Sequence, residues 1–441
     1  MTRFRLGAAD TFRSLQIRNF RLFFTGQGIS QIGHWLTLIA QTLLVLELTD
    51  SGVALGLLAA AQFGPVLLLG AWAGLLADRS DKRTLLIRVQ VFAMAQAFTM
   101  GALAFMDQPP LLAIYAVAAL GGVATAFDNP ARRSFVVEMV PEDHVTNAVS
   151  LNSALMTGSR VVGPALGGLL VATVGYGWTF WLDGLSFLAV IAGLRLMDPS
   201  KLRAAPVQAR GRGQVRAGLR YAWSVPELRV PLVMMGVIGT LAFNFQTVLP
   251  LFVTRDLGGS EVTFSLLMSV VSVGSLAGAL VAARRKDLEV HLVSVSAIAF
   301  GATMLGLALA PGQPVAFALG VAMGFASITF MTTSTAIVQL RAEPSMRGRI
   351  LALQAIVFLG STPIGGPVVG AVAEELGARF AIGVGALAAV AAGTYGLLTV
   401  HRSRRLEISD SVSAEAIADA ATDRGAGPVV VVPAVPQSSA R

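Results

Sequence analysis

Apolar residues along this chain occur in long uninterrupted runs, separated by short polar connections. Twelve such runs can be delimited, each 18 to 26 residues long. A helix needs about 20 apolar residues to cross the hydrocarbon core of a bilayer. The pattern therefore predicts an all-α membrane protein with twelve transmembrane helices, at 21–46, 52–77, 85–106, 111–128, 149–173, 177–197, 230–254, 262–282, 291–310, 314–339, 350–373 and 379–400.

The composition supports a bilayer as the solvent of these helices. Of 441 residues, 54% are hydrophobic and only 13% are charged, with a mean hydropathy of +0.70. Soluble proteins carry roughly 25% charged residues. The chain has no cysteine, which excludes disulfides, thiolate metal sites and cysteine nucleophiles. We expect no metal and no cofactor.

Basic residues are concentrated on one side of the predicted membrane. A net charge of +8 and an isoelectric point near 10.6 would suggest a nucleic-acid partner in a soluble protein. However, 29 of the 33 Lys and Arg residues fall in the N-terminal segment, the even-numbered connections and the C-terminal segment, when Arg195 at the end of the sixth span is counted with the connection that follows it. The positive-inside rule therefore places both termini on the cytoplasmic side of a plasma membrane, with no nucleic-acid partner. Because five Arg precede any long apolar run, we expect no cleavable signal peptide.

The longest connection divides the spans six and six, and small residues repeat between the two parts at an offset of 203 to 204. Gly33 matches Gly236, for example, and Gly163 matches Gly366. Two similar halves are typical of one class of secondary transporter. The predicted organisation is a cytoplasmic N-terminal segment (1–21), a first six-helix half (22–197), a central cytoplasmic loop with an interfacial helix (198–229), a second half (230–400) and a disordered cytoplasmic tail (401–441).

The connection between the second and third spans carries a motif, Gly74-Leu-Leu-Ala-Asp78-Arg79-Ser-Asp81-Lys82-Arg83. It resembles the signature of the major facilitator superfamily, with Asp81 at a position usually held by Gly. The resemblance implies a gate in which Asp78 pairs with the eleventh helix near Arg347–Arg349. A simple interface anchor is the alternative for Asp78. The predicted gating motif is Gly74, Asp78, Arg79, Lys82 and Arg83.

A second motif lies in the fifth span, where Gly163-Pro164-x-x-Gly167-Gly168 resembles the end of the antiporter motif of the same superfamily. Segments such as Arg160-Val-Val-Gly163-Pro164 resemble its enterobactin-exporter-like branch, the transmembrane secretion effectors. The resemblance implies two six-helix halves. Many drug antiporters of the superfamily carry an Arg in the fourth span, but 111–128 contains none. Proton coupling through such a residue is therefore not expected.

Polar side chains recur along one face of the first span. Gln27, Gln31, His34 and Gln41 are spaced by four, three and seven residues, which places them on one helical face. They line a substrate cavity or form hydrogen bonds between helices. His34 either carries the coupling proton or shares hydrogen bonds with Gln31 as a neutral side chain. Because the resemblance implies that spans one, four, seven and ten line the cavity, three further candidates are Tyr115, Asn244 and Thr333.

Charged residues inside the spans are a separate group of candidates. Arg160 and Asp183 fall within the fifth and sixth spans, and each would cost at least about 2.5 kcal/mol unpaired at mid-membrane. We expect an ion pair between them, with Glu47 or a water-filled cavity as the alternative surroundings of Arg160. Asp128 precedes Asn129-Pro130 and is expected to cap or break the fourth helix.

Together these features predict a secondary active transporter that exports small amphipathic or siderophore-like molecules in exchange for protons. Uptake by the same fold, and a non-transporting sensor that signals through the tail, are the alternatives. An enzyme or ATP-driven pump is not expected, because no phosphate-binding loop, metal cluster or supported nucleophile occurs in the sequence. The expected partners are a small-molecule substrate, a proton and the bilayer, with the protein acting as a monomer.

Overall fold

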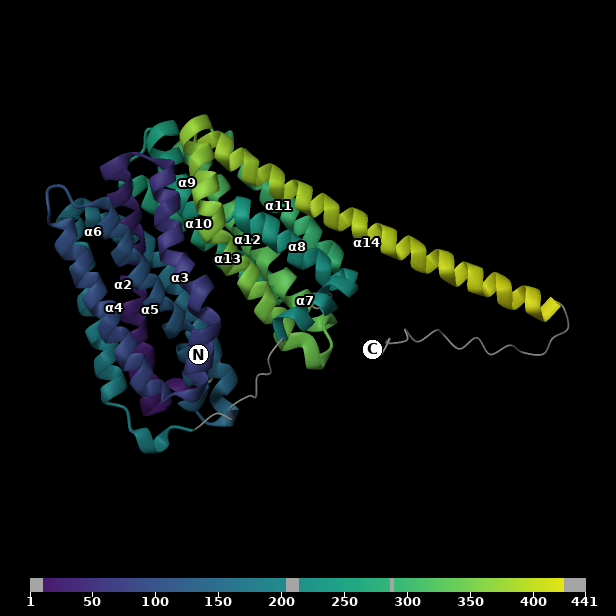
Figure 1. The fold of residues 1–441 in the computed structure, drawn as a ribbon, viewed down its shortest axis with the longest axis horizontal. Helices are drawn as coiled ribbons and strands as arrows, with labels where there is room; N and C mark the ends of the chain where they lie inside the picture. Colours follow the sequence, from purple (N-terminus) through teal and green to yellow (C-terminus); the bar gives the residue numbers. More distant parts are fainter. Residues whose placement is uncertain (1–10, 204–213, 286–288, 424–441) are drawn as a thin grey trace, which may run out of the picture.

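The computed structural model describes residues 11–203, 214–285 and 289–423, and in these ranges it contains helices and no strand. The first half begins with a short 3-10 helix, η1, and continues through five long helices (Figure 1). Their bounds are η1 Arg13–Gln16, α2 Arg18–Thr49, α3 Gly52–Arg79, α4 Lys82–Ala104, α5 Leu111–Glu138 and α6 Val145–Arg195, with the short η2 Glu142–His144 before α6.

The second half follows a connection that contains two short helices, η3 Pro199–Lys201 and α7 Gln214–Ser224. Its first span is divided among α8, α9 and a π-helical turn, η4. The bounds are α8 Pro226–Leu241, α9 Phe245–Leu251, η4 Phe252–Asp256, α10 Glu261–Ala283, α11 Val290–Ala308, α12 Gln313–Arg341, α13 Pro344–Leu376 and α14 Ala378–Asp423.

Eleven of the described helical segments are long and apolar enough to cross a membrane. One of them, α6, supplies two spans, because Gly175 has φ 82° and ψ 173° and turns the chain back on itself. Before the turn, Gly163 faces Trp35 of α2; after it, Gly193 faces the backbone of Leu22. The two arms of α6 thus run in opposite directions along α2, which confirms twelve spans.

Large apolar side chains cover much of the outer surface. Examples are Leu68 and Leu112, each 79% exposed, and Leu387, which is 62% exposed. In water such a surface would be strongly unfavourable, whereas acyl chains solvate it without cost. The distribution fits the multi-span membrane fold that the hydropathy pattern predicts.

The two halves pack by equivalent contacts. The fifth span, the first arm of α6, lies between α2 of its own half and α10 of the other. The eleventh span, α13, lies between α8 of its own half and α3 of the other. These are the two helices that carry the repeated Gly-Pro-x-x-Gly pattern at Gly163 and Gly366. The structure therefore confirms two related six-helix halves.

The halves meet closely at one end of the bundle, here called the closed end, where α2 ends and α3 begins. Gly52 and Gly56 of α3 allow the backbone of α13 to approach at Gly370 and Gly366. Beside them, Glu374 accepts hydrogen bonds from the Ser51 hydroxyl and from the Val53 N–H, the latter at 3.0 Å.

Other polar contacts join the halves at this same end. Arg255 binds Asp50, with 3.2 Å between Nε and Oδ1. The Tyr176 hydroxyl donates a hydrogen bond to Glu261 at 2.8 Å.

The other end of the bundle, called the basic end, carries the start of α2 and the connection 80–81 between α3 and α4. Figure 1 shows the two halves diverging toward it.

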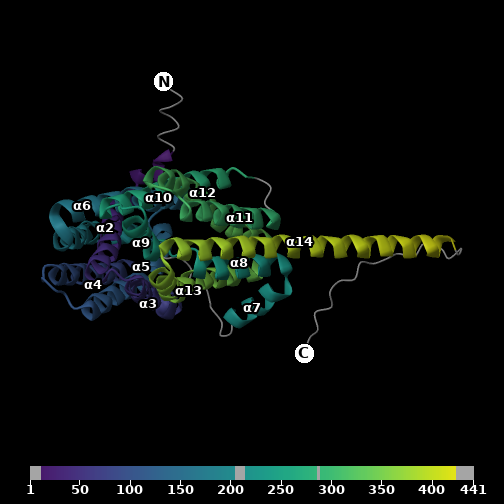
Figure 2. The ribbon, with the colours of Figure 1, turned by 90° about the horizontal axis from the view of Figure 1, so that it is seen from above.

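Two elements lie outside the twelve spans. α7 packs Tyr221 and Ala222 against α12 and α13 and leaves Leu219 and Trp223 exposed. An exposed Leu and Trp on one short helix fit the interfacial position expected for it. α14 leaves the bundle and continues as a helix to Asp423 (Figures 1 and 2). The prediction of a disordered tail from residue 401 is therefore wrong for residues 401–423, whose Ala and Glu residues have high helix propensity. Residues 424–441 lie outside the described ranges.

Candidate functional site: a cavity between the halves

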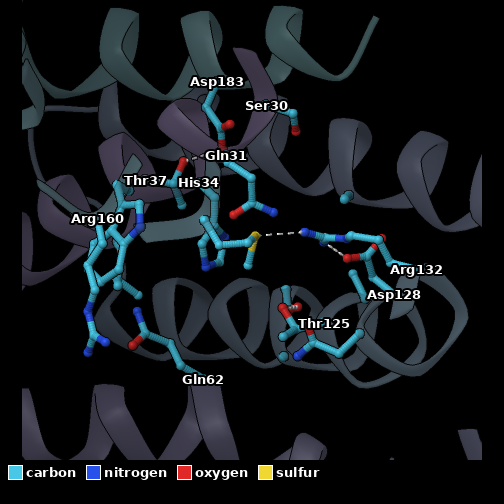
Figure 3. Close-up of a pocket in the computed structure, with 18 of the residues that line it drawn as sticks. Ser30, Gln31, His34, Thr37, Gln62, Thr125, Asp128, Arg132, Arg160 and Asp183 are labelled. Carbon is cyan, nitrogen blue, oxygen red and sulfur yellow. Dashed lines mark hydrogen bonds and ion pairs between the residues drawn. The ribbon is translucent and has the colours of Figure 1, made fainter. Parts of the chain in front are cut away.

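A cavity of about 500 Å³ lies inside the bundle, within the size range of small-molecule sites. Helices α2 to α6 of the first half and α10 and α12 of the second half contribute to its wall. His34 and Arg160 lie in the middle of their spans and yet are exposed, since both project into this space. Figure 3 shows the polar side chains that converge there. Polar groups at this depth are rare unless they face other protein groups or water.

The two sides of the cavity differ in chemistry. All of its charged lining residues come from the first half: Asp128, Arg132, Arg133, Arg160 and Asp183. The second half contributes only small or apolar side chains and hydroxyls, namely Ser272, Ser275, Ala279, Ile328 and Thr332. A ligand in the cavity would therefore meet charged groups only on the side of the first half and an uncharged wall on the other.

Asp128 belongs to a buried network on this charged side. It forms an ion pair with Arg132 one turn later and accepts a hydrogen bond of 2.8 Å from Gln90 of α4. The expectation that Asp128 ends the helix is wrong, because α5 continues through Pro130 to Glu138. The extension also places Arg132 in the cavity wall, where the predicted shorter span had no arginine.

Arg160 and Asp183 both line the cavity, but the structure does not pair them. The Arg160 guanidinium lies over the Trp35 indole, 5.8 Å from the ring centroid. Asp183 accepts hydrogen bonds from Thr37 at 2.6 Å and Ser186 at 3.2 Å. Among the described residues, no carboxylate is within ion-pair distance of Arg160, and no cation is within that distance of Asp183. The expected ion pair is therefore absent, and Arg160 has the cavity surroundings named as the alternative.

The position of α2 explains why the pair does not form. Each residue turns an α-helix by about 100°, so Trp35 points about 160° away from Thr37. The fifth span packs on the Trp35 face, where Gly163 adjoins its Cβ, and the sixth span packs on the Gly33 and Thr37 face. α2 thus lies between the two spans, and their charges approach it from opposite sides.

The polar stripe on α2 is divided by the structure. Gln31, His34 and Gln41 line the cavity, and Gln41 accepts a hydrogen bond of 2.6 Å from Gln62 of α3. No hydrogen bond joins His34 to Gln31 in the described part of the chain. Gln27 is 2% exposed and lies outside the lining.

The other three predicted cavity residues also lie outside the lining. Tyr115 donates from its hydroxyl to the Ala54 carbonyl at 3.0 Å, which joins α5 to α3. Asn244 donates to the Thr240 carbonyl at 2.7 Å, close to Gly365. Thr333 is 1% exposed inside α12, whereas the preceding Thr332 reaches the cavity.

The gating motif joins helix ends within the first half. Lys82 makes a buried ion pair with Glu138 at 2.5 Å. Arg83 donates hydrogen bonds to the carbonyls of Leu194 and Arg195 at 2.6 and 3.0 Å. These carbonyls belong to the C-terminal end of α6, where the helix dipole stabilises a positive charge. Among the remaining motif residues, Gly74 is buried, Asp78 is half-buried and Arg79 is exposed.

The unusual Asp81 has a local function. It is the N-cap of α4 and accepts a hydrogen bond from the Thr84 N–H at 2.7 Å. Hydrogen bonding by Thr84, with smaller contributions from Arg83 and Lys82, lowers the pKa of this carboxyl below its ordinary value. Asp is a strong N-cap residue and Gly a weaker one.

The antiporter-like motif allows close packing at the junction of the halves. Gly163 and Gly167 adjoin Trp35 and Ile39 of α2, and Gly168 adjoins Ser265 of α10. Pro164 is buried beside them. The Ala165 N–H donates to Ser269 of α10 at 2.9 Å, a direct hydrogen bond between the halves.

Several lining residues were missed by the sequence analysis, among them Gln62, Gln90, Gln96 and Thr125. Each has apolar residues directly before and after it in the sequence, and only the packing of α3, α4 and α5 shows that these side chains face one space. No group of three or more His, Asp or Glu residues within the described ranges is arranged to bind a metal ion.

The chain is similar to known proteins in sequence and in fold. Residues 9–434 match the family described as transmembrane secretion effector. The staphyloferrin A transporter of Staphylococcus aureus is 24% identical over 361 residues, covering 81% of this chain and 90% of that protein. The multidrug efflux pump Tap of Mycolicibacterium fortuitum is 25% identical over 361 residues, covering 78% and 87%. A bacterial homologue of the human lysosomal transporter Spinster, in an inward-facing and occupied conformation, shares the fold with a TM-score of 0.65 and 15% identity, covering 88% and 97%.

Proposed function

We propose that this chain, which belongs to the transmembrane secretion effector family of the major facilitator superfamily, exports small amphipathic or siderophore-like molecules in exchange for protons. Its family membership makes it a small-molecule transporter and not an enzyme, as the motifs predicted. Direction, coupling ion and substrate are the proposed part.

The observation that carries the proposal is the cavity between the halves, closed at one end. Transporters of this architecture expose one central site alternately to each side by rocking the halves. Here Glu374, Arg255 and Tyr176 join the halves at the closed end. Exposed Arg133, toward the basic end of α5, contributes to the cavity lining. The structure thus fits the state that would load substrate from the basic end.

The charge distribution supports a cytoplasmic position for the basic end. Arg79, Lys82 and Arg83 lie there, together with Arg195 at the end of α6. Cytoplasmic connections of membrane proteins are enriched in Lys and Arg. Both termini would then be cytoplasmic, and loading from the basic end would be loading from the cytoplasm, as export requires. The gate between Asp78 and the eleventh helix would form when the basic end closes.

Asp183 is the proposed proton site. Of the two acids in the cavity, Asp128 is neutralised by Arg132, whereas Asp183 is held by the hydroxyls of Thr37 and Ser186. A carboxyl without a cation can gain and lose its proton without breaking an ion pair. Asp183 also joins the sixth span to Thr37 of α2. A change in its charge would therefore alter the contact between two helices that line the cavity.

The proposal is tested in inverted membrane vesicles energised by a proton gradient. A panel of anionic, neutral and cationic amphipathic dyes is offered, and accumulation is followed with and without an uncoupler. We expect at least one dye to accumulate only while the gradient exists. Asp183→Asn should abolish gradient-driven accumulation but retain downhill movement, because substrate can still cross without a proton.

The control is Asp107→Asn, which changes an exposed acid in the connection between α4 and α5. Uncoupler-insensitive accumulation, or full gradient-driven accumulation by Asp183→Asn, would refute the proton mechanism. Accumulation only in right-side-out vesicles would establish uptake instead of export.

A further inference from the structure

Among the residues that the structure describes, Arg160 is the one cavity-lining cation deep in the bundle without an anionic partner. Arg132 is paired with Asp128, and Arg133 lies further along α5 toward the basic end. Asp183 is turned to the opposite side of α2, where Thr37 and Ser186 hold it. Arg160 nevertheless stays exposed to the cavity. A desolvated charge at this depth is costly unless water or an anion faces it.

The guanidinium is held in place on an aromatic surface. It lies over the Trp35 indole at 5.8 Å, and Gly163, one turn further along the same helix, adjoins the Trp35 Cβ. The electrostatic attraction between a cation and an aromatic face holds the guanidinium in position without using its hydrogen-bond donors. Arginine presents those donors as a planar fork that matches a carboxylate.

The opposite wall is uncharged. Ala279 and Ile328 of the second half line the cavity together with the hydroxyl side chains of Ser272, Ser275 and Thr332. A molecule with a charged group at one end and an uncharged body at the other would fit both walls. The volume of about 500 Å³ accommodates a drug-sized molecule.

We propose that Arg160 and Trp35 form a subsite for a carboxylate, so that the transported substrates are amphipathic organic anions whose uncharged part faces the second half. The inference rests on the proposed transport function and narrows its substrate class. The carboxylate would occupy the position next to Arg160 that sequence analysis assigned to Asp183.

A matched pair of ligands tests this inference on the detergent-purified full chain. The probes are 2-naphthoate and 2-naphthamide, which share a ring system and differ in charge, and binding is measured by calorimetry. We expect naphthoate to bind at least about tenfold more tightly, the usual scale of one charge-assisted hydrogen bond. Arg160→Gln should remove this preference by weakening naphthoate binding alone.

The matched control is Arg88→Gln, which changes an exposed arginine of α4 outside the cavity lining and should leave the preference intact. Arg160→Lys keeps the charge but loses the fork, so naphthoate affinity should fall severalfold while naphthamide affinity is unchanged. This second variant keeps the test valid if Arg160→Gln does not fold. Equal affinities in the wild type, or an unchanged preference in Arg160→Gln or Arg160→Lys, would overturn the inference.

The result is separable from the export proposal. Equal affinities of the wild type for naphthoate and naphthamide, with continued gradient-driven export, would remove the anion subsite and leave the transport function. A clear preference for naphthoate in a protein that moves no dye in vesicles of either orientation would support the subsite and refute the transport mechanism.

Discussion

At the scale of single residues, the departure of Asp81 from the family signature has a physical explanation. The chain turns sharply between α3 and α4, and the first N–H groups of α4 have no partner inside the helix. Asp81 accepts a hydrogen bond from one of these groups, the Thr84 N–H. The Gly that usually occupies this position allows the same turn but supplies no side-chain acceptor, so this chain gains a helix cap at a motif position.

The first prediction concerns this cap. Asp81→Ala should destabilise the protein by roughly 1 kcal/mol at pH 7, whereas Asp81→Gly should cost only a few tenths. Thermal unfolding in detergent measures both. Because the folded pKa of Asp81 is lowered, its contribution is complete above the unfolded pKa of about 3.9 and is lost as the pH falls through the folded value.

The wild type and Asp81→Ala should therefore converge in stability at acidic pH. A difference that is larger at pH 3.5 than at pH 7 would contradict the assignment of Asp81 as an ionised cap. Asp107→Ala, in an exposed connection, is the control for a general effect of lost charge.

At the scale of helices, the sequence was informative about which segments exist and much less about which ones touch. The hydropathy pattern delimited all twelve spans, and the repeated glycines identified the two halves. The ion pair of Arg160 and Asp183 failed because consecutive spans were assumed to be neighbours, whereas α2 separates them. Such contacts depend on helix order in three dimensions, which no local pattern encodes.

The same limit applies to the cavity wall. The stripe on α2 was identified because one helix carried several polar residues in register, and three of its four members line the cavity. The candidates Tyr115, Asn244 and Thr333 were chosen only because their spans were expected to line the cavity. None of the three lines it. Arg132 was missed because Pro130 was taken as the end of α5. A proline inside a membrane helix is tolerated when neighbouring helices support the backbone.

The second prediction uses the glycines that hold the fifth span against α2. A methyl group added at Gly163 would overlap the Cβ of Trp35, which is attached directly to the backbone and cannot rotate away. At Gly167 the added Cβ would lie 3.3 Å from Ile39, a contact that a small shift relieves. Gly163→Ala should therefore destabilise the protein by about 1 to 3 kcal/mol, and Gly167→Ala by clearly less.

Thermal midpoints in detergent measure this difference, with dye transport in vesicles as a second readout. Gly158→Ala serves as a matched control on the same helix, because its added Cβ would meet open space. Equal midpoints for Gly163→Ala and Gly158→Ala would show that the close approach to Trp35 is not required.

At the scale of the whole molecule, the contacts that join the halves determine which side of the membrane reaches the cavity. Glu374 of the second half accepts from Ser51 and from the Val53 N–H, so it caps the first turn of α3 in the first half. A negative charge at a helix N-terminus is favourable. This cap exists only while the closed end is shut, and it therefore stabilises that state relative to one open at the other side.

The last prediction follows from this difference between states. Glu374→Ala should shift the population toward the state in which the closed end is open, and a loss of roughly 0.5 to 1 kcal/mol, the scale of an exposed charge at a helix N-terminus, would change the ratio about two- to fivefold. In the cysteine-free chain, Gln62→Cys places a thiol in the cavity wall, roughly 15 Å from the start of α3 at 1.5 Å per residue. An impermeant thiol reagent added to intact cells should label this cysteine severalfold faster in Glu374→Ala than in the parent.

Two controls accompany this measurement. Glu375→Ala, which changes an exposed neighbour, should leave the labelling rate unchanged, and a cysteine at exposed Ser200 of the basic end should stay unlabelled. Labelling at Ser200 would reverse the proposed orientation, and equal rates for the two Glu variants would show that the cap does not control access.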